Sequence, residues 1–420
     1  MNIFLREAKI LDPKSPHHNK VVNIHIKDGR IESIDKKEHR GETVIEAKGM
    51  VLSPGWFDMR ANFNDPGNEH REDLVTGAAT AAQSGFTGVA ILPNTEPVIQ
   101  TKSHIEYVRS RSINFLTDIL PMAAVTIDAK GEELTEMLDL HQAGAVAFTD
   151  GEKPLWHTDI MLKSLIYLQK VNGLLINQPE DQLLTRFGSM NESTVSTVLG
   201  LKGMPTLAEH LMIKRDLDLL KYAGGKMHFS NITSAESVSL IKKAKKKGYH
   251  ITCDVSIHHL IHTDEDLMDY DSNYKINPPL RTDNDRKALI KGLKEGVIDV
   301  ITSSHTPLDE ESKKLEFDRA EFGIAGLQTM LPSLFRLSNE LNSEEWIEKI
   351  THNPRMILNQ PSASIEAKQT ANLTLIDTKS KWTLDDSTNR SKSRNSPFFQ
   401  EELTGKVKAV INGTQFQIFD

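Results

Sequence analysis

The sequence predicts an α/β protein, a (β/α)₈ TIM barrel with a small β-sandwich domain built from both ends of the chain. Eight apolar segments alternate with amphipathic helical segments between residues 52 and 355, the number and spacing typical of such a barrel. The first of these segments runs into RANFN at residues 60–64, which lacks the glycine-rich phosphate loop of the competing doubly wound sheet. Both chain ends, in addition, consist of short β-like segments.

The two chain ends alternate apolar and polar residues, as half-buried strands do. NIFLREAKILD and VVNIHIKDGRIESID stand near the start of the chain, and the pair Asn412-Gly413 near its end is typical of a hairpin turn. Because the middle of the chain has a different pattern, we expect residues 1–51 and 356–420 to pair into one β domain. Residues 52–355 then form the barrel.

The barrel strands are the apolar segments that precede helical or turn-forming stretches. In chain order they are expected at residues 56–61, 87–92, 116–124, 145–148, 174–177, 226–230, 251–256 and 298–303. Two of the intervening helices are well marked. One covers residues 206–222 and ends before the pair Gly224-Gly225, and another begins at Ser234 and ends at Gly248.

Composition narrows the class of protein. The 420 residues carry 50 Lys+Arg against 58 Asp+Glu, a formal net charge of −8, which argues against a nucleic-acid surface. No apolar run approaches the roughly 18 residues of a membrane span, and the N-terminus carries charges too early for a secretory signal. A single cysteine, Cys253, fits a reducing cytoplasm and excludes a cysteine-built zinc site. The 16 histidines could still supply a metal site.

In barrel enzymes the reactive residues lie at the C-terminal ends of the strands. The polar residues at or just after these ends are, in chain order, Arg60, Asn62, Asn94, Asp150, Gln178, Asn231, His258, His259, Ser304 and His305. Amide side chains make up much of this set. The histidines His258, His259 and His305 are expected to be hydrogen-bonded structural residues, and His228 to lie in the core.

Motifs over almost the whole chain resemble those of dihydroorotases of the class related to allantoinases and hydantoinases, in the amidohydrolase superfamily. The matching blocks are PGWFDM (residues 54–59), DPG (65–67), ED (72–73), PNT (93–95), ED (180–181), HHL (258–260), KINPPLR (275–281), FGIAGL (322–327), NP (353–354) and NSPF (395–398). The resemblance implies a barrel with a small β domain, a zinc centre, a homodimer, and the interconversion of dihydroorotate and N-carbamoyl-aspartate.

The positions that resemble the family's metal ligands do not hold metal-binding side chains. The family's His-x-His appears as Arg60-Ala61-Asn62, and its acidic pair after the fourth strand is reduced to Asp150. The histidines after the fifth and sixth strands are Gln178 and Asn231, and the catalytic aspartate of the Asp-His pair is Ser304, followed by His305.

The positions that resemble the substrate contacts are also altered. The arginine that holds the substrate carboxylate in the family corresponds to Asn64, and a histidine after the eighth strand corresponds to Leu308. Asn94 and Asn277 match the family's remaining substrate contacts. Without the arginine, these two amides are expected to pack loops rather than to bind substrate tightly.

These replacements predict that no zinc binds and that the chain is inactive or strongly impaired. Arg60 has only N–H donors and a permanent positive charge, so it cannot ligate a cation. The amide oxygens of Asn62, Gln178 and Asn231 suit hard cations rather than zinc. Ser304 cannot act as a carboxylate base, and this hydrolysis needs both an activated water and a base.

Two arrangements of Arg60 are open. In the first, its guanidinium takes the place of the metal and pairs with Asp150, while Asn62, Gln178 and Asn231 complete a hydrogen-bond network. In the second, Arg60 turns toward solvent and water fills the space.

Three functions are open as well. The first is a silent dihydroorotase homologue of pyrimidine biosynthesis that acts as a scaffold for aspartate transcarbamoylase, a role that the resemblance implies. The second is an active dihydroorotase with an unusual metal site. The third is a non-catalytic protein that binds a small ligand in the old pocket.

Overall fold

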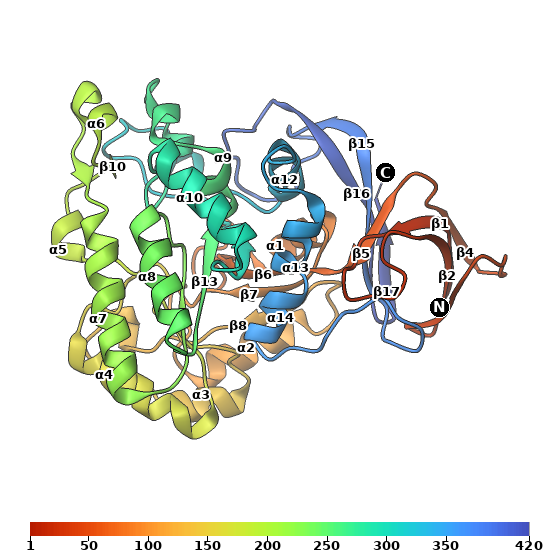
Figure 1. The fold of residues 1–420 in the computed structure, drawn as a ribbon, viewed down its shortest axis with the longest axis horizontal. Coiled ribbons are helices and arrows are strands. Elements are labelled where there is room, and N and C mark those ends of the chain that lie inside the picture. The colour runs from red at the N-terminus through yellow and green to blue at the C-terminus, as the bar shows by residue number, and fades with distance from the viewer. Residues whose placement is uncertain (420) are drawn as a thin grey trace.

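The computed structural model describes residues 1–419 as two bodies, a barrel and a β domain, that lie side by side (Figure 1). The β domain is an eight-stranded sheet in the order β17-β16-β15-β5-β1-β2-β3, with β4 beside β1. Its strands are β1 (Asn2–Ile10), β2 (Val21–Lys27), β3 (Arg30–Asp35), β4 (Thr43–Glu46), β5 (Val51–Pro54), β15 (Asn372–Thr383), β16 (Glu402–Asn412) and β17 (Gln415–Ile418). Strands from both chain ends therefore share one sheet.

The two chain ends meet where β5 pairs with β15 in antiparallel register, with Pro54 opposite Leu373. At the other end of the sheet, β16 and β17 form the expected hairpin. Asn412 pairs with Gln415, and Gly413 has a positive φ of 58°, which this tight turn requires. In Figure 1 the sheet curls over on itself, as a small β-sandwich does.

The barrel consists of two parallel sheets that are joined by single bridges. One sheet has the order β6-β7-β8 and the other the order β14-β13-β12-β9. Their strands are β6 (Trp56–Ala61), β7 (Phe86–Ile91), β8 (Asp118–Pro121), β9 (Leu175–Asn177), β12 (Met227–Phe229), β13 (Ile251–Ser256) and β14 (Val300–Thr302). A parallel bridge between Ala61 and His305 closes the ring.

The expected strand at residues 145–148 is present only as an irregular segment. Phe148 forms parallel bridges to Ala123 on one side and Leu175 on the other, so the segment still occupies the fourth place in the ring. It lies between a left-handed turn at Gly144 and the loop that begins at Thr149.

Helices surround the barrel (Figure 1). They are α1 (Leu74–Gln83), α2 (Lys102–Ser112), α3 (Met137–Ala143), α4 (Thr158–Leu168), α5 (Gln182–Thr185), α6 (Thr194–Leu199), α7 (Leu207–Ala223), α8 (Ala235–Lys246), α9 (Ile257–Ile261), α10 (Asp283–Lys294), α11 (Glu310–Lys313), α12 (Met330–Arg336), α13 (Ser343–Ile350) and α14 (His352–Ile357). A two-stranded sheet, β10 (Met190–Asn191) and β11 (Gly203–Met204), lies between α5 and α7 in the chain. The two helices expected in detail are α7 and α8. Gly224 follows α7, and the Ser234 side chain caps α8 by accepting from the Ser237 N–H.

Each body has its own apolar core. Trp56, fully buried at the start of β6, makes edge-to-face contacts with Phe86 and Trp346 in the barrel core. A separate cluster that includes Ile3, Leu373 and other strand residues fills the β domain. Within residues 1–419, no helix combines the length and the apolar character needed to cross a membrane.

Candidate functional site at the mouth of the barrel

A cavity of about 310 Å³ lies at the C-terminal ends of the barrel strands. Its lining residues are Arg60, Glu152, Asn231, Ser256, His258, His259, Ile276, Asn277, Ser304, Thr306, Glu321, Phe322, Gly323 and Ile324. Six of the residues singled out from the sequence line this cavity: Arg60, Asn231, His258, His259, Asn277 and Ser304. The others lie behind or beside its wall: they are Asn62, Asn64, Asn94, Asp150, Gln178, His305 and Leu308.

Arg60 lies inside the barrel mouth and not in solvent, with only 4% of its surface exposed. Its Nη2 donates to the side-chain oxygen of Gln178 at 2.7 Å, and Nη1 donates to Ser230 Oγ at 3.4 Å. Burial lowers the pKa of Arg60, while the charges of Glu152, Asp254 and Asp58 oppose that effect. The alternative in which Arg60 turns to solvent is therefore wrong.

The expected pairing of Arg60 with Asp150 is also wrong. The Asp150 carboxylate accepts from the backbone N–H groups of Val125 and Thr126, each at 2.9 Å, and from the Thr126 hydroxyl. It thus holds the segment that follows β8. Burial raises the pKa of Asp150 to about 6, although these hydrogen bonds lower it. The carboxylate could not reach Arg60 without leaving three donors unpaired.

The remaining substituted positions form a hydrogen-bond network. Asn62 Nδ2 donates to Glu152 Oε1 at 2.8 Å, and Ser304 Oγ donates to the side-chain oxygen of Asn231 at 2.9 Å. The backbone N–H of Asn231 donates to Asp254 Oδ1. The expected network around Arg60 is therefore present only in part, because Asn62 bonds to Glu152 and not to Arg60, Gln178 or Asn231. Glu152 and Asp254 supply carboxylates in place of Asp150.

Three carboxylates of this region were not recognised from the sequence. Glu152 lines the cavity, and Asp58 and Asp254 are buried beneath it on β6 and β13. Asp58 accepts from the N–H groups of Arg60 and Ser303 and from the Ser303 hydroxyl. The signal that could have identified Asp58 and Asp254 is a charged residue within an apolar strand, which is rare unless the charge is paired.

The donor set at the mouth does not suit zinc. Among residues 1–419, no three or more side chains of His, Cys, Asp or Glu are grouped so that they could hold a metal ion. The positions that resemble the family's ligands offer a guanidinium, three amides, a hydroxyl and the Asp150 carboxylate, and each of these side chains already makes a hydrogen bond within the protein. A cation at this place would also meet the positive charge of Arg60.

The histidines differ from one another in their environment. His228 is fully buried and bonded to Thr252 Oγ1 and Asp254 Oδ2 at 2.7 and 2.9 Å, which confirms its place in the core. The His259 Nε2 bonds to the Pro278 carbonyl oxygen at 3.0 Å. The His258 ring lies against the Ser303 carbonyl, but neither ring nitrogen makes a hydrogen bond of normal geometry.

His258, His259 and His305 are all buried, and burial affects the protonation of the first two. It lowers the pKa of His259 to about 4 and that of His258 well below its usual range, so both rings are neutral at pH 7. His305 is equally buried, and its Nε2 lies 3.6 Å from Glu72 Oε2. Neither His258 nor His305 fits the expected pattern of a fully hydrogen-bonded structural histidine.

The positions that resemble substrate contacts brace loops. Asn94 Nδ2 donates to the Asp150 carbonyl, and its oxygen accepts from the Glu152 N–H, both at 3.0 Å. Asn64 Nδ2 donates to the Pro307 carbonyl at 3.3 Å. Asn277 Nδ2 donates to Glu180 Oε2 at 2.9 Å, and the Asn277 side-chain oxygen has no partner.

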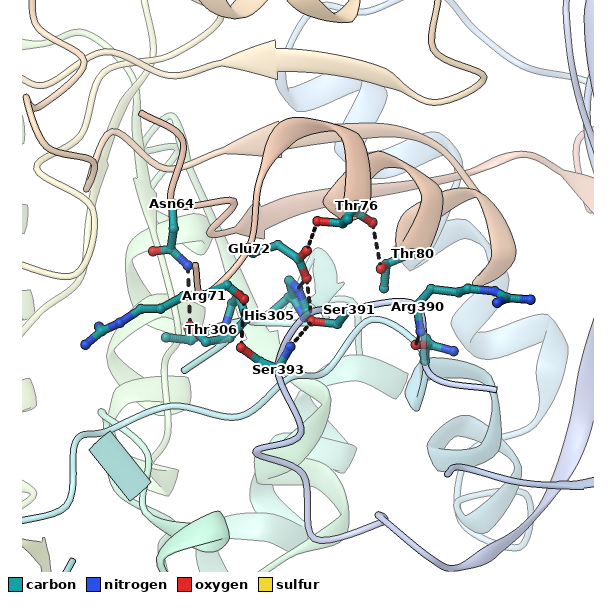
Figure 2. Close-up of polar contacts among 12 residues, drawn as sticks. Asn64, Arg71, Glu72, Thr76, Thr80, His305, Thr306, Arg390, Ser391 and Ser393 are labelled. Carbon is teal, nitrogen blue, oxygen red and sulfur yellow. Dashed lines mark hydrogen bonds and ion pairs between the residues drawn. The ribbon is translucent and has the colours of Figure 1, made fainter. Parts of the chain in front are cut away.

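A segment of the β domain, residues 390–396, runs along the barrel beside the site, and we call it the strap. Figure 2 shows the Glu72 carboxylate between the hydroxyls of Thr76 and Ser391, and Ser393 Oγ donating to the Arg71 carbonyl at 2.7 Å. Asn395, in the strap, donates to the Thr306 carbonyl and accepts from the Leu308 N–H. Leu308 is buried there, with 4% exposed. The strap fixes the loop that forms one side of the mouth.

Known proteins resemble both the sequence and the fold. A family profile described as "Dihydro-orotase-like" matches residues 49–237. A dihydroorotase of Geobacter metallireducens is 36% identical over 418 residues, which is 98% of each chain. A dihydroorotase of Carboxydothermus hydrogenoformans is 39% identical over 398 residues, 93% of each chain.

Solved structures support the fold. An L-hydantoinase (dihydropyrimidinase) of Arthrobacter aurescens superposes with a TM-score of 0.85 at 18% identity, over 100% of this chain and 97% of that one. A dihydropyrimidinase of Brevibacillus agri gives a TM-score of 0.83 at 18% identity, over 100% and 95% of the two chains. The α/β architecture of barrel and β-sandwich domain is thereby confirmed. The chain belongs to the dihydroorotase-like family of the amidohydrolase superfamily.

Proposed function

We propose that this chain is a catalytically silent dihydroorotase homologue that serves pyrimidine biosynthesis as a scaffold for aspartate transcarbamoylase. The observation that carries the proposal is the position of Arg60. Its guanidinium is buried in the barrel mouth and bonded to Gln178, where the resemblance calls for the first histidine ligand of a zinc centre. A fixed positive charge at this position disfavours the binding of a metal cation by repulsion.

The side chains around Arg60 also lack the second requirement for hydrolysis, a base that can take a proton from an attacking water. Ser304, in the place of the family's catalytic aspartate, is a hydroxyl that donates to Asn231. Asp150 is engaged by three donors from the segment after β8. The chain's own residues therefore bind and orient one another and leave no free base in the family's position.

The scaffold role and a homodimeric state follow from the resemblance, and the cytoplasmic location follows from the single cysteine; all three are parts of the same proposal. Silent dihydroorotase-like chains accompany aspartate transcarbamoylase and hold its assembly together. An intact barrel with a substituted mouth supports this role, because a scaffold needs the surface of the fold and not its metal centre.

The test has two parts. Purified protein dialysed against zinc and then washed should contain far less than one zinc per chain, and should give no turnover of dihydroorotate or N-carbamoyl-aspartate above background. The same protein mixed with the aspartate transcarbamoylase of its organism should co-elute with it in size-exclusion chromatography. Absence of co-elution at micromolar concentrations would overturn the scaffold role.

An active dihydroorotase is the second candidate, and the full-length similarity to proteins named dihydroorotase favours it. Its acid–base residue would be Asp150 or Glu152, the two carboxylates that follow the fourth strand position. Zinc-dependent turnover that Asp150→Ala or Glu152→Ala abolishes, with folding unchanged, would establish this candidate and refute the silent one. Turnover that both variants retain would point to a contaminating enzyme.

A further inference from the structure

Several hydrogen-bond donors at the cavity of the barrel mouth have no acceptor within residues 1–419. Arg60 has five N–H donors, and two of them are donated within residues 1–419, to Gln178 and Ser230. Asn231 lines the same cavity and uses only its oxygen and its backbone N–H there. The Gln178 Nε2, which is buried beside Arg60, has no partner. Buried donors of this kind normally have acceptors.

The Arg60 charge, in addition, has no direct counter-charge. Among residues 1–419 the guanidinium forms no salt bridge, and the carboxylates that act on it at longer range are Glu152, Asp254 and Asp58. Asp254 is engaged by His228, Ser230 and the Asn231 N–H. Because these three carboxylates act on the guanidinium only at longer range, its unused N–H groups remain available to a negatively charged group that approaches from the cavity.

The other charged and titratable groups at the cavity leave this place open. Glu152 accepts from Asn62 at 2.8 Å and from the Thr306 hydroxyl at 3.3 Å, so its carboxylate is held on its own side of the mouth. The rings of His258 and His259 are neutral at pH 7 because burial lowers their pKa values. Glu321 lines the cavity but is bound to Arg71 at 2.9 Å.

We propose that the cavity binds a small molecule with an oxyanion group, a carboxylate or a phosphate, which accepts hydrogen bonds from Arg60 and Asn231. A guanidinium offers paired N–H groups that match the two oxygens of such a group. The ligand's other end faces Glu152 and is held best when it carries an N–H donor. This inference rests on the proposed function, because the guanidinium can serve an anion only where no zinc ion is bound.

This site differs from the positions that resemble the family's carboxylate contacts. Among the substrate-contact positions, Asn277 lines the cavity, but its Nδ2 donates to Glu180 Oε2. The others hold Asn64, which donates to the Pro307 carbonyl, Asn94, which braces the Asp150 loop, and the apolar Leu308. Their donors are used by the backbone. The oxyanion therefore sits at the place that resembles the metal site, and a ligand should bind in a different orientation from a dihydroorotase substrate.

Isothermal titration calorimetry at constant ionic strength tests the inference. The probes are succinate and aspartate for a carboxylate, inorganic phosphate for a phosphate, and chloride as the simple-anion control. The wild-type chain should bind at least one oxyanion probe with a saturable, millimolar or tighter Kd. Arg60→Met should weaken that binding at least tenfold, and Arg60→Lys by less, because a lysine keeps the charge but not the paired donors. Arg111→Met, at an exposed position on α2, should leave it unchanged.

Each outcome decides the inference. A wild-type chain that binds none of the probes at concentrations up to roughly 50 mM would overturn it, as would an Arg60→Met variant that binds as well as wild type. Should Arg60→Met fail to fold, the comparison of wild type with Arg60→Lys and Asn231→Leu replaces it, and equal binding by all three would refute the site. Zinc content and turnover are measured on the same samples. Bound zinc with turnover refutes the proposed function, whereas absent zinc with no anion binding refutes only this inference.

Discussion

The hydrogen bond from Arg60 to Gln178, 2.7 Å long, joins opposite sides of the barrel mouth. Arg60 belongs to β6, the first strand of the ring, and Gln178 directly follows β9, the fifth. The bond therefore crosses the position of the barrel axis and connects strands that do not pair with each other.

A double-mutant cycle measures this bond. Gln178→Leu should lower the free energy of unfolding by about 1–3 kcal/mol, because it leaves the buried guanidinium without its best acceptor. The double variant Arg60→Met/Gln178→Leu should recover most of that loss, with a coupling of about 1 kcal/mol or more. Urea denaturation gives the values. Gln182→Leu, at an exposed position of α5, is the control and should change stability by less than about 0.5 kcal/mol. Additive single effects would contradict the bond.

The pH dependence of stability should contain a contribution from Asp58. Burial raises the pKa of Asp58 to about 7, and hydrogen bonds from Ser303 and the Arg60 N–H only partly offset this. A carboxyl whose pKa is raised on folding contributes stability that is present below its unfolded pKa, near 4, and is lost as pH rises through the folded pKa.

Asp58→Asn should therefore flatten the decline in unfolding free energy between about pH 4 and pH 8, by up to about 4 kcal/mol in total. Chemical denaturation at several pH values gives the two curves. Asp159→Asn, at an exposed residue of α4, should keep the wild-type slope. Parallel curves for wild type and Asp58→Asn would show that this carboxyl does not titrate in the window.

The strap should depend on Glu72. The buried carboxylate of Glu72 accepts from the hydroxyls of Thr76 and Ser391 (Figure 2), and the strap contains trypsin sites at Arg390, Lys392 and Arg394. Glu72→Ala should release Ser391 and speed tryptic cleavage there at least several-fold, since cleavage follows local opening.

Mass spectrometry of the tryptic fragments identifies the cleavage site. Glu316→Ala, at an exposed position, should leave the rate of cleavage at the strap unchanged. Equal rates in Glu72→Ala and wild type would mean that the other anchors, such as the Ser393 bond to the Arg71 carbonyl, hold the strap without Glu72.

The contact between the barrel and the β domain should depend on Asp12. Its fully buried carboxylate bonds to His352 Nε2 at 2.8 Å on α14 and to the Ile365 N–H at 2.9 Å. Burial acts to raise its pKa, but these bonds outweigh that effect and lower it. Its stabilising contribution is therefore complete above about pH 4 and disappears as pH falls further.

Asp12→Ala should lower the free energy of unfolding at pH 7 by about 3 kcal/mol. Thermal and urea denaturation measure the change. Asp218→Ala is the matched control, because Asp218 is exposed on α7 and its loss should have little effect. A loss of equal size in both variants would show that the buried pair is not special.

Much of the fold could be predicted from alternation and periodicity. The bounds of β6 and β13 match the expected segments residue for residue, whereas β8 covers only Asp118–Pro121 of the expected 116–124. Apolar runs indicate where a segment is buried. They do not show where its backbone leaves the ladder, which depends on the neighbouring strands.

The site could be predicted in part. The sequence indicated that metal ligands are replaced by Arg60, Asn62, Gln178 and Asn231. The structure contains the hydrogen bond from Arg60 to Gln178 that belongs to the first of the two expected arrangements of Arg60. The prediction that Arg60 pairs with Asp150 was wrong, because the direction of a side chain depends on its local backbone. The turn after β8 presents two N–H groups to the Asp150 carboxylate, which accepts from them and not from Arg60. Glu152 is two residues further along the same loop, and only the three-dimensional path of that loop shows that it faces the mouth.

The pairing of Pro54 in β5 with Leu373 in β15 has a consequence for biosynthesis. The ribosome releases the N-terminal strands first, and roughly 300 residues must follow before their partners emerge, which takes about 15–60 s at typical elongation rates. During that interval β5 has an unpaired edge, a surface prone to association with other chains. Chaperone protection of the nascent N-terminal strands should therefore matter more for this chain than its final stability suggests.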